Sequence, residues 1–99
     1  MKVKPEVQKE IQKLQEKQLK RTMKLLSGSD KKSLTTFLQS GSTPGSKDFR
    51  ALKPNVQRGV IKLNLTSVDV MLKRGKNPIS KMRLKLAKFS YERMLKATT

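Results

Sequence analysis

The strongest constraint on this chain is its charge. Its 99 residues include 24 lysines and arginines but only seven aspartates and glutamates, so the formal net charge is +17. Repulsion among so many like charges opposes compact folding, and a surface of this kind is suited to binding a polyanion. Nucleic acid is the polyanion that fits best, because lysine and arginine side chains release the counterions condensed around phosphates.

The positive charge is spread along the chain. Residues 1–26, 27–75 and 76–99 carry net charges of +5, +6 and +6, with no acidic half and no isolated basic tail. We therefore expect phosphate contacts on several faces of the molecule, or along an extended segment of it.

The sequence offers few of the side chains that catalyse reactions or bind metals. Histidine and cysteine are absent, which removes the usual proton carrier near neutral pH, the most reactive nucleophile and most transition-metal ligands. The seven acidic residues are scattered, and no Gly-rich phosphate loop ends in Gly-Lys-Ser/Thr. We expect a protein that is not an enzyme, with no cofactor and no metal site.

The same composition bears on where the protein works. Without cysteine there is no disulfide framework, and nothing in the first residues matches a secretion signal. No apolar stretch approaches the length needed to cross a bilayer. We expect an intracellular protein of the cytoplasm, nucleoid or nucleus that is not secreted and has no membrane partner.

The N-terminal part, residues 1–40, is predicted to form a helical hairpin or arm. Pro5 suits the first turn of a long amphipathic helix that runs to about Leu26. Its apolar stripe consists of Val7, Ile11, Leu14, Leu19, Met23 and Leu26. Three placements fit this stripe: packing on the rest of the domain, pairing in a coiled-coil arm, or lying along a phosphate backbone. A short helix over about 31–39 follows, with Ser29 or Asp30 as its N-cap.

A linker and a mixed C-terminal part are predicted next. Residues 41–55 are rich in Gly, Ser and Pro, which is typical of a linker or extended loop. Residues 56–99 are predicted to form a strand followed by two helices. The strand rests on the alternation of Ile61, Leu63 and Leu65, and Thr66–Asp69 resembles a capping box that would open a short helix.

The last helix is predicted to begin at Asn77-Pro78 and to reach about Lys96, after a stop at Gly75. One apolar line consists of Ile79, Met82, Leu86 and Phe89, and a second line of Leu84, Tyr91 and Leu95 is expected to widen the same face. The expected fold class is mainly α, with one or two short strands in the C-terminal part.

Two nucleic-acid-binding arrangements are compatible with this layout. The first is a helix-turn-helix formed by residues 66–74, a turn at 75–77 and a helix from Pro78, with Ser80, Lys81 and Arg83 facing the bases of DNA. The second is binding to a folded RNA through its phosphates. Lysine outnumbers arginine 18 to 6, and lysine is a flexible point charge better suited to phosphates than to base edges.

In composition and layout, the long basic helix, the linker and the small core resemble ribosomal proteins and ribosome-assembly factors. This resemblance implies RNA binding within a ribonucleoprotein, so RNA is the expected partner ahead of DNA. The alternatives are a DNA-binding helix-turn-helix or nucleoid-type regulator, and a small viral or phage adaptor whose amphipathic helices bind protein subunits of a larger complex.

Local charge density selects the candidate phosphate contacts. They lie on the first helix, around the loops and on the last helix. The residues are Lys17, Lys20, Arg21, Lys24, Arg50, Arg58, Lys73, Arg74, Lys76, Lys81, Arg83, Lys85 and Lys88.

Overall fold

The computed structural model describes residues 4–98, which form five helices and no strand. These are α1 (Pro5–Lys24), α2 (Gly28–Ser40), α3 (Lys47–Arg50), α4 (Pro54–Arg74) and α5 (Pro78–Ala97). Residues 1–3, at the start of the predicted N-terminal arm, and Thr99 lie outside the described residues.

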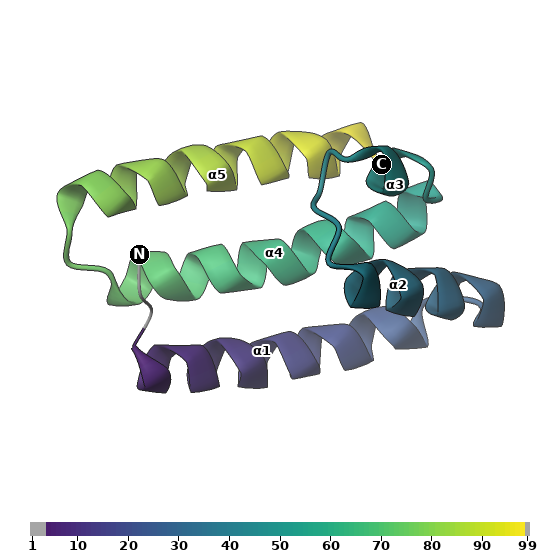
Figure 1. The fold of residues 1–99 in the computed structure, drawn as a ribbon, viewed down its shortest axis with the longest axis horizontal. Helices are drawn as coiled ribbons and strands as arrows, with labels where there is room; N and C mark the ends of the chain where they lie inside the picture. The colour runs from purple at the N-terminus through teal and green to yellow at the C-terminus, as the bar shows by residue number, and fades with distance from the viewer. Residues whose placement is uncertain (1–3, 99) are drawn as a thin grey trace.

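The three long helices form one antiparallel layer (Figure 1), with α4 in the middle, α1 along one edge and α5 along the other. Helices α2 and α3 sit at the end of this layer where α4 begins. The predicted N-terminal, linker and C-terminal segments share one hydrophobic core there, formed by Leu26, Leu34, Phe37, Phe49, Val56, Val60 and Ile61. Phe49 comes from the predicted linker, and its ring lies 6.1 Å from that of Phe37.

Several helix boundaries follow from local sequence as expected. Pro5 and Pro78 stand in the first turns of α1 and α5, and the Asn77 side chain accepts hydrogen bonds from the amides of Ile79 and Ser80. Helix α4 ends directly before Gly75. The cap of α2 was predicted wrongly, because Ser27 is the N-cap and accepts from the Asp30 amide.

The predicted strand is wrong. Ile61, Leu63 and Leu65 lie inside α4, which is continuous over 21 residues, and the expected capping box at Thr66 lies inside it too. The physical reason is that α4 packs on both flanks, against α1 on one side and α5 on the other. A helix buried on two sides carries apolar residues around most of its circumference, and a short stretch of it imitates the alternation of a strand.

The contact between α1 and α4 is close at Gly59. A side chain there would place its Cβ 2.7 Å from Cγ2 of Thr22, a buried residue of α1. Further along the same seam, the Gln15 amide donates to the Leu63 carbonyl over 3.2 Å. Gly59 therefore lets the two helices approach, and it fixes α1 against the centre of the layer.

Candidate nucleic-acid interface

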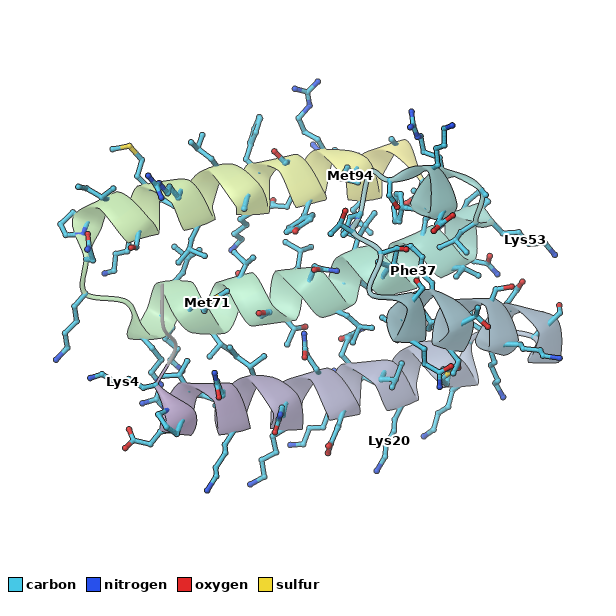
Figure 2. All side chains as sticks on the ribbon, in the orientation of Figure 1. Lys4, Lys20, Phe37, Lys53, Met71 and Met94 are labelled. Atoms are coloured by element: carbon cyan, nitrogen blue, oxygen red, sulfur yellow. The ribbon has the colours of Figure 1, made fainter. Side chains whose placement is uncertain are left out.

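The outer side of α1 carries a row of basic side chains, which we call the α1 ridge. Its members follow one another at intervals of four, four, three, one and three residues, so they share one side of a helix with 3.6 residues per turn. All are exposed, and Figure 2 shows Lys20 pointing away from α4. The α1 ridge consists of Lys9, Lys13, Lys17, Lys20, Arg21 and Lys24. From Lys9 to Lys24 it spans about 22 Å, given a rise of about 1.5 Å per residue.

Acidic residues on α1 reduce this charge only in part. Glu10 is held by Arg74 of α4, whose Nη2 lies 2.7 Å from Oε2 of the carboxylate. This ion pair joins the start of α1 to the end of α4, so Arg74 already has an anionic partner. Glu6 and Glu16 are exposed on the same helix. The ridge keeps an excess of positive charge because six cations face two exposed carboxylates.

A groove of about 460 Å³ lies beside the ridge, between α1 and the first half of α4. Three basic side chains border it: Arg21 from the ridge, and Arg58 and Lys62 from α4. The other polar residues that line it are Gln18, Thr22 and Asn55, and no carboxylate is among the lining residues. An anion in this groove would meet positive charge from two helices, and the nearby carboxylate of Asp30 lies behind Asn55 rather than in the lining.

Arg58 is held by the C-cap residue of α5. Its Nη2 donates to the carbonyl oxygen of Thr98, 3.1 Å away, and the residue is half-buried. Its Nε is buried and has no hydrogen-bond partner among the described residues. The guanidinium thus ties the C-terminal cap of α5 to α4 while it lines the groove. A phosphate contact by Arg58 would use guanidinium N–H groups that do not donate to Thr98.

The other predicted contact residues lie apart from this surface. Arg50 is exposed on α3, at the end of the layer where α2 and α3 sit. Lys73 and Lys76 are exposed around the turn from α4 to α5, and Arg83 and Lys85 are exposed on α5.

Lys81 and Lys88 lie on the side of α5 that faces α4. Lys81 is half-buried. Lys88 forms an ion pair with Asp69 over 2.9 Å, and the hydrogen bond and charge of that carboxylate raise the pKa of Lys88. The structure therefore brings together Lys17, Lys20, Arg21 and Lys24, with Arg58 across the groove. Arg74 lies beside the start of the ridge, where it pairs with Glu10, and the remaining candidates lie elsewhere.

Three basic residues of this surface were missed from the sequence. Lys9 and Lys13 extend the spacing of Lys17 by one and two helical turns, so the repeat of four residues could have identified them. Lys62 was assigned to a strand, and only the packing of α4 against α1 places it beside Arg21.

Asp30 has a structural role at the start of α2. It is buried, and Asn55 of α4 donates to its Oδ2 over 2.7 Å. This hydrogen bond, assisted by Ser27 and by the charge of Lys53, lowers the pKa of Asp30 below 3.8, although burial acts in the opposite direction. The carboxylate therefore stays ionised and holds α2 to α4.

Residues 4–98 contain no group of three acidic side chains positioned to hold a metal ion. Over the same range, every helix is too short or too polar to pass through a bilayer. No protein-family model, curated protein or solved structure matches this chain significantly.

Proposed function

We propose that this protein binds nucleic acid without catalysing a reaction, mainly through phosphates, and that its preferred partner is structured RNA in a ribonucleoprotein. The observation that carries the proposal is the α1 ridge beside a cationic groove without carboxylates. Lysine and arginine side chains in such a row can follow a phosphate backbone and release its counterions.

The surroundings of the ridge favour a folded nucleic acid over a single strand. Proteins that bind single strands stack bases on exposed aromatic rings. Phe37 and Phe49 are in the core, Tyr91 packs against it, and the exposed Phe89 lies on α5, at the other edge of the layer. No aromatic residue belongs to the ridge or lines the groove. The surface therefore offers charge and shape, which suits a double-stranded region.

The geometry gives less support to sequence-specific reading of DNA. In a helix-turn-helix the two helices cross at a steep angle, and residues early in the second helix face the bases. Here α4 and α5 are antiparallel neighbours (Figure 1), and Ser80 and Lys81 are half-buried. A nucleoid-type protein that binds DNA without sequence preference remains the alternative, because it would use the same phosphate contacts.

Binding measured by fluorescence anisotropy over a salt series tests the proposal. The probes are an RNA hairpin, a DNA duplex and a single-stranded RNA of equal length. We expect the hairpin to bind most tightly, with a steep salt dependence. Replacing Lys13, Lys17 and Lys20 by Gln should reduce the slope of log K against log salt by about two to three, because each lost phosphate contact contributes about 0.7–0.9.

The matched control replaces Lys31, Lys32 and Lys47 by Gln. These lysines are exposed on α2 and α3, so the control has the same net charge as the ridge variant. We expect the control variant to keep nearly the same slope of log K against log salt as the unmodified protein. Equal losses in both variants would mean that net charge alone drives binding, and weak binding of all three probes at physiological salt would refute the proposed function.

A further inference from the structure

The outer side of α5 carries a continuous row of large apolar side chains, which we call the α5 stripe. Ile79, Met82, Leu86 and Phe89 are 61–67% exposed. The line of Leu84, Tyr91 and Leu95, expected on the same face, lies on the opposite side, where Tyr91 and Leu95 pack against the core. Positions two apart, such as 82 and 84, are separated by about 200° around a helix. Single exposed hydrophobic residues are ordinary, whereas a continuous apolar row marks a binding surface.

The spacing of the α5 stripe indicates the shape of what covers it. Intervals of three, four and three residues match the a and d positions of two coiled-coil heptads. The row is about 15 Å long, and it is one side chain wide rather than a broad apolar face. This is the surface that packs against a single helix.

The residues beside the stripe indicate the charge of that helix. Arg83 and Lys85 occupy the flanking e and g positions of the first heptad, and both are exposed. The same positions of the second heptad hold Ser90 and Glu92, so the basic flank belongs to the first heptad. Arg93 continues the seam, with its Cζ 5.9 Å from the centre of the Phe89 ring. In coiled coils these flanking positions select partners by opposite charge.

We propose that α5 binds an amphipathic helix of a partner protein, with an apolar seam flanked by acidic residues. A second copy of this chain fits less well, because its first heptad presents Arg83 and Lys85 and no acidic residue, and each molecule carries a net charge of +17. A lipid surface fits less well, because the stripe is narrow and Arg93 stands in line with it. This inference does not depend on the nucleic-acid proposal, which concerns the opposite edge of the layer.

Two synthetic peptides of three heptads test the inference by fluorescence anisotropy at physiological salt. Both carry Glu at positions e and g, and they differ only at a and d, which are Leu in one peptide and Ser in the other. The Ser peptide measures the nonspecific attraction of any acidic helix to a protein of this charge. We expect the full-length protein to bind the Leu peptide at least about tenfold more tightly, because only this peptide can bury the stripe.

The difference in affinity between the Leu and Ser peptides should vanish in the variant Met82→Ser/Leu86→Ser, which keeps the net charge of the protein. It should persist in Leu25→Ser, which removes a leucine that is 81% exposed at the end of α1. The inference would be overturned if the unmodified protein bound both peptides with equal affinity. It would also be overturned if Met82→Ser/Leu86→Ser preferred the Leu peptide as strongly as the unmodified protein does.

The other occupants are tested on the same proteins. Association of the unmodified chain in sedimentation, lost in Met82→Ser/Leu86→Ser, would assign the stripe to a second copy. Binding to vesicles of phosphatidylcholine and phosphatidylserine, lost in that variant while the peptides do not discriminate, would assign it to a membrane. Either result would replace the proposed helical partner.

Discussion

Helices α1 and α5 have the same length and the same neighbour, yet their outer sides differ. Each has 20 residues and packs antiparallel along α4, at opposite edges of one layer (Figure 1). The outer side of α1 carries the basic ridge, whereas that of α5 carries an apolar stripe with basic residues beside it. Positive charge is common to both helices. The arrangement of apolar residues distinguishes a surface suited to phosphates from one suited to a protein helix.

The largest effect on stability is expected where α1 meets α4. Gly59→Ala would set its Cβ against Cγ2 of Thr22, so we expect it to reduce the free energy of unfolding by about 1–3 kcal/mol. Urea unfolding followed by circular dichroism measures this change. Adding Thr22→Ser removes the clashing methyl group, and the double variant should recover most of the loss.

An increase in stability for Gly59→Ala alone would contradict the close packing of α1. In a helix position open to solvent, alanine is favoured over glycine by about 1 kcal/mol. That outcome would mean that α1 does not pack closely against α4. The cationic groove between the two helices would then lack one of its sides.

A smaller effect should separate the two sides of α5. Leu95→Ala removes a side chain that packs against the core, and we expect a loss of about 1–2 kcal/mol, because the residue is only half-buried. Leu86→Ala changes an exposed residue of the α5 stripe and should alter stability by less than about 0.5 kcal/mol. Thermal or urea unfolding compares them directly. Equal losses would mean that the stripe is buried in the free protein.

The smallest effect should be a pH dependence at Asp30, away from both outer surfaces. Because its pKa is lowered in the folded state, the unfolded chain binds more protons at acidic pH. The stabilising contribution is therefore full above the ordinary pKa of about 3.8 and is lost as the pH falls through the lower, folded value. Urea midpoints at neutral pH and near pH 3 measure this loss. Asp30→Asn should reduce the urea midpoint at neutral pH and make the midpoint fall less between neutral pH and pH 3. If the midpoint of the variant fell as much as that of the unmodified protein, the role of this carboxylate would be contradicted.

The helix boundaries that were predicted correctly depend on local signals. The proline at the first turn of α1, the Asn77-Pro78 start of α5 and the stop before Gly75 depend on residues within one turn of each boundary. The four ridge residues from Lys17 to Lys24 lie together because one helix carries them all. The spacing of Lys9 and Lys13 was also readable from the sequence.

The features that were predicted wrongly or missed depend on tertiary packing. Helix α4 is buried on two flanks, so Ile61, Leu63 and Leu65 showed no single apolar face and resembled a strand. In α5 two apolar lines compete, and only contact with α4 determines that Leu95 faces inward and Leu86 outward. The groove joins Arg21 to Lys62 across 41 positions of the sequence, so no local pattern reveals it.

Lysine footprinting tests the central claim most directly, because it maps the bound surface on the unmodified protein. Lysines are acetylated with and without a saturating RNA hairpin, and mass spectrometry measures the protection of each one. We predict protection of Lys13, Lys17, Lys20, Lys24 and Lys62, with little change at Lys31, Lys32 and Lys47. Uniform protection, or protection centred on α2 and α3 with the ridge still reactive, would contradict the account.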